Sequence, residues 1–324
     1  MPFSIVPARL SHHPPGYSRP VAEEVASTPG ALAHPLTEAL ELKSPIAGLL
    51  SGSPLTNDIS RRSFLRRGLG ALAAPILPAC GGPPRGEDSQ WGVRLSARPG
   101  SPTRSPTRSP EIGLSRLGIG GGRDGTLYVP ESYSPDTPLP LFIGMHGAGG
   151  SADSWADYQA RAESRGMVLL APESRSRQTW DRIENGSFGP DVRFLDQALK
   201  TVFDQCRIDP EQIALGGFSD GASYVLSLGI SNGDLFSHLV AFSPGSYYAT
   251  DPIVGKPSMF VSHGTEDTIL PVTTTRGFIV PAFRDTGYDV TYEEFTGGHQ
   301  VPVTIAEAAL DWFLGTGMSP PQPF

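Results

Sequence analysis

Ser219 has the residue type and the setting of a nucleophile. It lies in the pentapeptide GFSDG at 217–221, between an aliphatic run at 213–216 and a helix-like stretch at 222–228. A G-x-S-x-G sequence between a strand and a helix predicts a sharp turn that pushes the serine hydroxyl out of the backbone surface. The chain has 38 glycines, so the pattern alone arises readily by chance, and its meaning depends on partner residues elsewhere.

Among the histidines that follow Ser219, His299 is the expected base. A serine hydroxyl becomes a strong nucleophile when a histidine accepts its proton and a carboxylate orients that histidine. His299 lies in a glycine-rich loop, GGH, between the last predicted strand and the last predicted helix. His238 begins a predicted buried strand and His263 follows another, so we expect both to be structural.

Asp267 is the expected carboxylate. It lies in SHGTEDTILPV, on the loop after a strand predicted at 258–262, where a carboxylate can reach the histidine loop. The chain order serine, acid, histidine is the order found when the serine lies on a strand-to-helix turn. Glu266 is the alternative beside Asp267, and Asp289 is less suitably placed at the start of a strand.

A second loop offers hydrogen-bond donors for a developing alkoxide. The strand predicted at 139–145 runs into HGAGG at 146–150. The small residues of this loop allow its backbone to approach a substrate carbonyl closely. Acyl transfer uses two such donors, one of them from the residue after the nucleophile. We therefore expect the N–H groups of Ala148 and Asp220 to form an oxyanion hole. His146 precedes the serine in the chain, and we expect it to brace this loop rather than to act as a second base.

Strands and helices alternate in the segment that carries these residues. The expected strands are 114–119, 126–129, 139–145, 167–171, 213–216, 238–242, 258–262 and 290–295, and the expected helices are 155–165, 192–206, 222–230, 278–286 and 305–314. This alternation predicts the α/β class, with a mostly parallel sheet and helices on both faces. No segment is long enough for a large cap domain, so we expect an open site.

The turn of the opening hairpin contains GGGRDG at 120–125, which matches the dinucleotide-binding pattern G-x-G-x-x-G. That pattern requires a helix directly after the glycines. Here a strand follows, and Pro130 ends it. We therefore expect a hairpin turn and no nucleotide.

Four segments resemble the α/β-hydrolase superfamily: PLPLFIGMHGAGG, DPEQIALGGFSDGA, SHGTEDTILPV and GGH. Within it they are similar to the phospholipase/carboxylesterase group and to secreted esterases of the polyhydroxybutyrate-depolymerase and feruloyl-esterase type. The resemblance covers roughly residues 112–316 and implies the α/β-hydrolase fold and a serine esterase without cofactor or metal ion. It implies that Ser219, Asp267 and His299 form a catalytic triad. It also implies that the N–H groups of Ala148 and Asp220 form the oxyanion hole. The chain departs from the depolymerases in lacking their disulfide-forming cysteines and substrate-binding domain, so we expect no polymer substrate.

The expected substrate is a small ester with a short acyl group or an aryl group. The segment 172–190 follows the carboxyl end of a predicted strand, the usual position of substrate loops in open α/β sheets. Within it, Trp180 and Phe188 would either line an acyl or aryl pocket or simply anchor the loop. The alternatives are a serine peptidase or thioesterase on the same fold, and a non-catalytic surface lipoprotein that binds a partner.

The distribution of charge argues against nucleic acid as a partner. Residues 1–110 contain 12 Lys and Arg against 7 Asp and Glu, and residues 111–324 contain 13 against 26, giving net charges of +5 and −13. Nucleic-acid binding requires a basic surface, whereas the part with the candidate site is acidic.

The first third of the chain has the features of an export signal. We expect residues 1–59 to be disordered or an N-terminal extension, with translation starting near Leu55. Residues 60–80 contain SRRSFLR and then an apolar stretch too short to span a bilayer, which predicts twin-arginine export. LPAC at 77–80 is similar to a lipobox, so we expect a membrane tether through Cys80. Cleavage after a simpler signal is the alternative.

Residues 81–111 form the expected linker, because they are rich in Pro, Ser, Thr and Arg. The catalytic domain is expected at 112–317 and a short tail at 318–324. The protein is accordingly expected in the periplasm or at the cell surface. Cys206 lies in a predicted amphipathic helix, and we expect it to be buried and not to form a disulfide with Cys80.

Overall fold

The computed structural model describes residues 92–100 and 106–316 of the 324. The predictions of disorder, twin-arginine export and lipidation of Cys80 concern residues 1–80 and lie outside the described residues. Parts of the expected linker and the tail also lie outside them. Within the described ranges, no helix has the length and apolar composition that a bilayer span requires.

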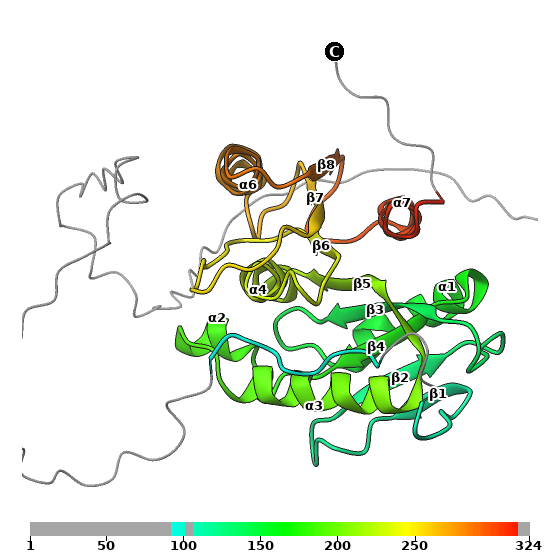
Figure 1. The fold of residues 1–324 in the computed structure, drawn as a ribbon. Helices are drawn as coiled ribbons and strands as arrows, with labels where there is room; N and C mark the ends of the chain where they lie inside the picture. The colour runs from blue at the N-terminus through cyan, green and yellow to red at the C-terminus, as the bar shows by residue number, and fades with distance from the viewer. Residues whose placement is uncertain (1–91, 101–105, 317–324) are drawn as a thin grey trace, which may run out of the picture. The chain divides into compact units, whose positions relative to one another are not determined.

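An eight-stranded sheet runs through the described chain (Figure 1). Its strands are β1 (Gly113–Arg116), β2 (Gly125–Val129), β3 (Leu139–Met145), β4 (Val168–Pro172), β5 (Ile208–Phe218), β6 (His238–Phe242), β7 (Ser258–Gly264) and β8 (Val290–Phe295). Their spatial order is β1-β2-β4-β3-β5-β6-β7-β8. The pairs β1–β2 and β2–β4 are antiparallel, and all other neighbours pair in parallel. The mostly parallel sheet predicted from the alternating sequence is therefore confirmed.

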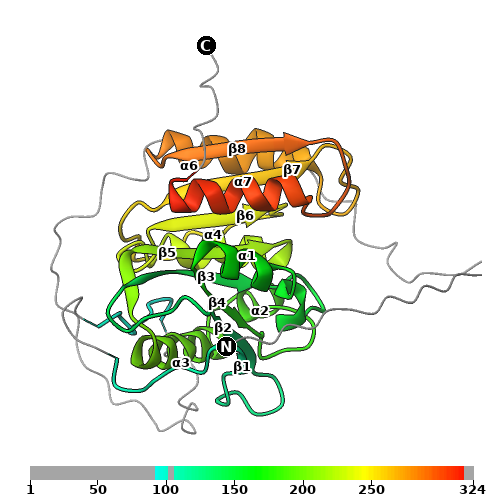
Figure 2. The ribbon, with the colours of Figure 1, turned by 90° about the vertical axis from the view of Figure 1, so that its right-hand side faces the viewer.

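Helices cover both faces of this sheet (Figure 2). One face carries α1 (Tyr158–Arg165) and α7 (Val303–Leu314), and the other carries α3 (Pro190–Gln205), α4 (Asp220–Gly229) and α6 (Val280–Asp285). Successive residues of β3 show the division, because side chains alternate along a strand. Phe142 packs in the cluster that includes Phe313 of α7, whereas Ile143 packs in the cluster that includes Leu199 of α3. Cys206, directly after α3, is a buried free thiol.

Several elements differ from the expected ones. β5 is longer than predicted, because it begins at Ile208. The helix expected at 278–286 is the end of a longer segment formed by α5 (Val272–Thr274), the π-helical turn η3 (Thr275–Ile279) and α6. The sequence does not predict η2 (Ala152–Trp155) or α2 (Asp181–Asn185), because four or five residues carry too little periodicity to reveal a helix.

Residues 92–100 belong to the folded domain, although the sequence predicted a linker over 81–111. Val93 and Leu95 are buried in the core with exposures of 4% and 3%. The Leu95 N–H donates to Asn232 Oδ1 at 2.8 Å. The folded part thus begins before residue 112. The sequence does not reveal this because two apolar residues in a Pro- and Arg-rich stretch give no periodic pattern, and their partner lies 137 positions away.

Candidate active site

The turn between β5 and α4 holds Ser219 in a strained backbone conformation. Its φ of 58° and ψ of −121° lie in a region where residues other than glycine are rare. The Ser219 N–H donates to Phe242 O at 2.9 Å, and the Ser223 N–H donates to Ser219 O at 3.0 Å. The sharp turn that the G-x-S-x-G pattern predicts is therefore present.

Glycine is required on both sides of this serine. A Cβ on Gly217 would lie 2.6 Å from the carbonyl carbon of Gly221, and a Cβ on Gly221 would lie 2.2 Å from Met145 O. Both distances are shorter than real Cβ atoms show. The two glycines thus allow the first turn of α4 to pack against the ends of β5 and β3.

His299 lies between Ser219 and Asp267. Its Nε2 is 2.8 Å from Ser219 Oγ, and its Nδ1 is 2.6 Å from Asp267 Oδ2. The three residues follow β5, β7 and β8, parallel strands whose carboxyl ends share one edge of the sheet. The Phe218 ring packs on the His299 ring with their centroids 4.7 Å apart. The fold therefore brings together the three residues that the sequence singles out.

Asp267 is held as a carboxylate. Its Oδ1 accepts the N–H groups of Ile269 and Leu270, each at 2.9 Å. Burial opposes its ionisation, but these hydrogen bonds and His299 outweigh burial, so the pKa of Asp267 lies below its ordinary value. Glu266, the alternative acid, is exposed, whereas the Asp267 side chain is buried against the histidine.

His263 contacts the same carboxylate. Its Nε2 lies 3.2 Å from Asp267 Oδ2 and 2.7 Å from Leu270 O, and its Nδ1 lies 2.8 Å from Thr275 Oγ1. A carbonyl oxygen only accepts hydrogen bonds, so Nε2 carries a proton. Burial lowers the pKa of His263 and keeps the ring neutral. We expected a structural histidine. Its four-residue spacing from Asp267 in HGTED is the signal that could have revealed the contact with the acid.

The loop that follows β3 lies beside Ser219. A Cβ on Gly147 would be 3.3 Å from the Ser219 Cβ. The N–H groups of Gly149 and Gly150 are donated to backbone carbonyls, at 2.6 and 3.1 Å. Ala148, between them and Gly147, is exposed at the cavity next to the serine.

Asp220 is the first residue of α4 and directly follows the serine. The first N–H groups of a helix have no acceptor within the helix, so the backbone of Asp220 offers a donor at this point. Its side chain is engaged elsewhere, because the Thr179 hydroxyl donates to Asp220 Oδ2 at 2.7 Å. Of the two residues expected to donate to an oxyanion, Asp220 directly follows Ser219, and Ala148 directly follows Gly147, which lies beside Ser219.

A cavity of about 380 Å³ opens beside His299 and Phe218, the residue before Ser219. It lies between the loop after β3, helix α1 and the start of α7, and its lining includes Ala148, Trp155, Tyr158, Phe218, His299 and Val303. Most of its lining residues are apolar or aromatic, and Asp157 and Arg161 add two charged side chains, so the cavity suits a group with an apolar body. Within residues 92–100 and 106–316, no group of three or more His, Cys, Asp or Glu side chains is arranged to hold a metal ion.

Trp180 does not line this cavity, which corrects one of the roles expected for it. The side chain is 1% exposed, and its Nε1–H donates to His146 O at 2.8 Å, so it anchors the segment 172–190. Phe188 also lies elsewhere, half-buried with its ring centroid 5.5 Å from that of Tyr224. The cavity forms from α1 and α7 instead, and their approach to each other is a tertiary contact without a local sequence pattern.

Several curated proteins with similar sequences are esterases, although no protein-family model matches the chain. Over 159 residues the chain is 26% identical to the probable feruloyl esterase C of Aspergillus niger, covering 46% of this chain and 57% of that protein. Over 169 residues it is 27% identical to the bifunctional acetylxylan esterase/xylanase XynS20E of Neocallimastix patriciarum, covering 49% of this chain and 24% of that protein. The matched region thus spans little more than half of the feruloyl esterase and a quarter of the bifunctional enzyme.

Solved structures share the fold. Esterase PE8 superposes with a TM-score of 0.50 at 19% identity, covering 63% of this chain and 100% of that one. The fluorophosphonate-binding serine hydrolase F of Staphylococcus aureus gives a TM-score of 0.50 at 13% identity, covering 63% and 99%. These likenesses confirm the predicted fold class. The chain therefore has the α/β-hydrolase fold, and its sequence resembles those of esterases in that superfamily.

Proposed function

We propose that the protein hydrolyses carboxylic esters through a covalent acyl-enzyme on Ser219. The observation that carries the proposal is the position of His299, within hydrogen-bond distance of both Ser219 Oγ and Asp267 Oδ2. With Asp267 ionised, Nδ1 of His299 carries a proton, and Nε2 is free to accept the proton of the serine hydroxyl. This is the tautomer that general-base chemistry on Ser219 needs.

The proposed reaction has two steps. In the first, Ser219 Oγ bonds to the ester carbonyl carbon while its proton passes to His299 Nε2, and the alcohol then leaves with that proton. In the second, water gives a proton to His299 and attacks the acyl carbon, and Ser219 leaves with the proton as the acid is released. Asp267 stabilises the imidazolium of His299 in both steps.

We assign the oxyanion hole to the backbone N–H groups of Ala148 and Asp220. Ala148 borders the cavity, while the N–H groups of the next two residues are already donated within the protein. Asp220 begins α4, and the start of a helix favours negative charge. Two preorganised donors of this kind stabilise the alkoxide of the tetrahedral intermediate.

The proposed substrates are small esters with short acyl or aryl groups. The cavity beside Ser219 has a volume of about 380 Å³ and a mostly apolar lining, which suits a group of that size. Among the relatives, a feruloyl esterase and an acetylxylan esterase are named for one aryl-bearing and one short acyl group. Both groups belong to the proposed class.

A chain-length series run beside Ser219→Ala tests this function. The substrates would be p-nitrophenyl esters from acetate to palmitate, with methyl ferulate, a thioester and an anilide in the same assay. We expect the highest kcat/KM for short or aryl esters, and a loss of about 10⁶-fold in kcat for Ser219→Ala. Rates that rise steadily to the longest chain would contradict the substrate class. Wild-type rates in Ser219→Ala would contradict the mechanism, and faster thioester or anilide cleavage would favour a thioesterase or a peptidase.

We also propose twin-arginine export with a tether through Cys80. The support is the sequence of residues 60–80: SRRSFLR, a short apolar stretch and LPAC. Replacing Arg61 and Arg62 by Lys should leave the protein in the cytoplasm, as measured by cell fractionation. Export at the wild-type level in this variant would contradict the route. Mass spectrometry of the exported protein tests the tether. A new N-terminus without a lipid would show a simple cleaved signal and no tether through Cys80.

A further inference from the structure

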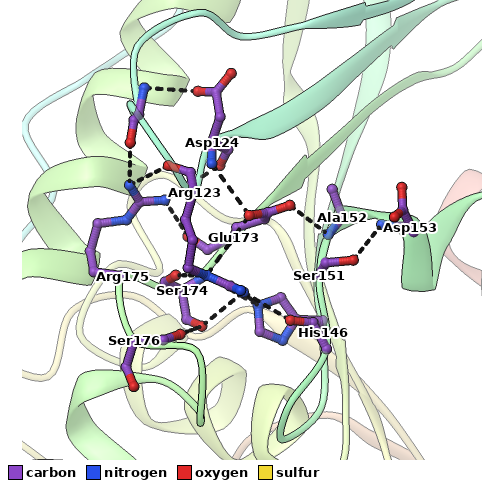
Figure 3. Close-up of polar contacts among 12 residues, drawn as sticks. Arg123, Asp124, His146, Ser151, Ala152, Asp153, Glu173, Ser174, Arg175 and Ser176 are labelled. Atoms are coloured by element: carbon purple, nitrogen blue, oxygen red, sulfur yellow. Dashed lines mark hydrogen bonds and ion pairs between the residues drawn. The ribbon is translucent and has the colours of Figure 1, made fainter.

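The glycine-rich turn between β1 and β2 carries a half-buried arginine to the loop that follows β3 (Figure 3). Arg123 lies in this turn, and its side chain is only 17% exposed. Asp124 fixes the turn by accepting the N–H groups of Gly118 at 2.7 Å and Gly120 at 2.9 Å. A Cβ on Gly120 would lie 2.2 Å from Arg123 O, so glycine is required there. The turn is thus built to hold Arg123 in one position.

Arg123 joins two segments that lie beside the candidate site. Its Nε–H donates to Ser174 O at 2.5 Å, and a terminal nitrogen donates to Gly150 O at 2.8 Å. Ser174 follows β4, and Gly150 ends the loop after β3. Glu173 Oε2 lies 3.8 Å from Arg123 Nε and offsets its charge. The planar guanidinium spans both carbonyls at once, which the single ammonium group of a lysine does not reproduce.

The same terminal nitrogen of Arg123 faces His146 Nε2 (Figure 3), at a distance of 3.3 Å. His146 Nε2 accepts the Ser174 N–H at 3.1 Å, whereas its Nδ1 lies 2.7 Å from Gly147 O, which only accepts. His146 is therefore a neutral ring with its proton on Nδ1. Burial lowers the pKa of His146, and the positive charge of Arg123 lowers it further, so this state is maintained.

His146 in turn fixes one peptide group of the loop. Gly147 O accepts the Nδ1–H of His146 and also the Gly150 N–H at 3.1 Å. In a trans peptide the N–H points opposite to the carbonyl oxygen. The direction of Gly147 O therefore determines the direction of the Ala148 N–H, which is one of the two proposed oxyanion donors.

We propose that Arg123 is a positioning residue for the oxyanion hole, which holds the peptide between Gly147 and Ala148 in its productive orientation through Gly150 O and His146. The inference rests on the proposed function, because it assumes that the Ala148 N–H receives the developing negative charge. A misaligned donor weakens binding of the transition state more than binding of the ester. Loss of Arg123 should therefore lower kcat and leave KM nearly unchanged.

The test compares Arg123→Gln, Arg123→Lys and a control, Arg116→Gln. Arg116 is the matched control because it lies on β1 of the same hairpin, its side chain is 62% exposed, and its ion pair with Asp124 Oδ2 is long, at 3.9 Å. For each variant, kcat and KM for a short p-nitrophenyl ester are normalised to the sites titrated by a fluorophosphonate. The Kd of phenylboronic acid, which forms a tetrahedral adduct on the serine, is measured in parallel.

Arg123→Gln should lower kcat about 10- to 100-fold and weaken boronate binding by a similar factor, with KM within about twofold of the wild type. Arg123→Lys should have a kcat and a boronate affinity between those of the wild type and Arg123→Gln, because lysine keeps the charge but not the planar guanidinium. It provides the same comparison if the glutamine variant does not fold. Arg116→Gln should match the wild type.

A purely structural role for Arg123 predicts a different result. Both Arg123 variants would then have a lower unfolding midpoint and fewer titratable sites, but each folded site would keep the wild-type kcat and boronate affinity. That result would overturn the proposal, as would an equal loss of kcat in Arg116→Gln. Failure of the proposed function itself is distinguishable, because the wild type would then neither hydrolyse esters nor be labelled at Ser219, and the inference would fall with it.

Discussion

At the scale of single residues, the proposed chemistry depends on which atoms carry protons. The Asp267 carboxylate accepts two backbone N–H groups and faces the rings of His299 and His263. Each donor favours the charged form of a carboxylate. The charge in turn fixes a proton on Nδ1 of His299, so Asp267 acts on Ser219 through the tautomer of the histidine between them.

Replacing Asp267 by Asn should lower kcat by about 10⁴-fold, because the amide removes the charge and can donate to Nδ1, which moves the ring proton to Nε2. The matched control is Glu266→Gln, which changes the neighbouring exposed carboxylate and should leave kcat within about twofold. kcat for one short ester is the measurement, with circular dichroism to show that both variants fold. A larger loss of kcat in Glu266→Gln than in Asp267→Asn would show that Glu266 is the acid.

The three residues proposed as a catalytic triad could be singled out from the sequence because each lies in a short, recognisable pattern. Ser219 is marked by its glycines, and His299 and Asp267 by loops between predicted strands and helices. The contacts of Arg123 could not be predicted in the same way. Its acceptors lie 27 and 51 positions further along the chain, and no local pattern relates a hairpin turn to them.

At the scale of elements, β3, β5 and α4 approach one another too closely for side chains at their contact points. Gly221 is the tightest of these points, because its Cβ would meet Met145 O at 2.2 Å and His146 O at 2.5 Å. These are backbone atoms at the end of β3, which cannot rotate away as a flexible side chain would. Any side chain at 221 must therefore move the helix or the strand.

Gly221→Ala should lower the free energy of unfolding by more than about 2 kcal/mol, because the added methyl group displaces backbone. Gly277→Ala is the control, since a Cβ there would meet nothing within 4 Å. It should be neutral or slightly stabilising. Urea unfolding of the two variants gives both free energies, and equal values would show that the contact at Gly221 is not tight.

Two buried carboxylates join α2 to α3. Asp181 Oδ2 accepts the Asp191 N–H at 2.9 Å, and Asp191 Oδ2 accepts the Asp181 N–H at 2.6 Å. Burial, and then the charge of Asp181, raise the pKa of Asp191 to about 6. A raised carboxyl pKa means that the folded state holds its proton more tightly than the unfolded state does.

This difference makes the Asp191 contribution to stability fall as pH rises. Below about 4 the group is protonated in both states, and between about 4 and about 6 only the unfolded state ionises, so the free energy of unfolding declines by roughly 3 kcal/mol in total. Asp191→Asn removes the titration. The excess stability of the wild type over this variant, from urea unfolding, should be larger at pH 4.5 than at pH 7. An excess that does not change with pH would contradict the raised pKa.

At the scale of the whole molecule, the fold depends on a segment that its composition assigned to a linker. Arg94 pairs with Asp234 at 2.6 Å, and the adjacent Val93 and Leu95 are buried in the core. The alternation of strands and helices was sufficient to predict the sheet and its covering helices. The true N-terminal boundary and the position of the cavity were not predictable, since both arise where distant parts of the chain meet.

A chain that begins at residue 92 should be more stable than one that begins at residue 112, by about 3–6 kcal/mol. The reason is the apolar surface that Val93 and Leu95 bury, which is worth about 1.5–3 kcal/mol for each side chain that is fully buried. Urea unfolding of the two shortened chains measures the difference. Equal free energies would show that residues 92–100 rest on the domain without stabilising it.

Because α4 begins at the residue after Ser219, the hydroxyl lies at the electropositive end of a helix of 10 residues. The aligned peptide dipoles there are equivalent to about half a positive charge. Peptide groups do not titrate, and a side-chain substitution does not remove them. This part of the attraction for a developing negative charge is therefore constant over the whole range of pH in which the protein stays folded.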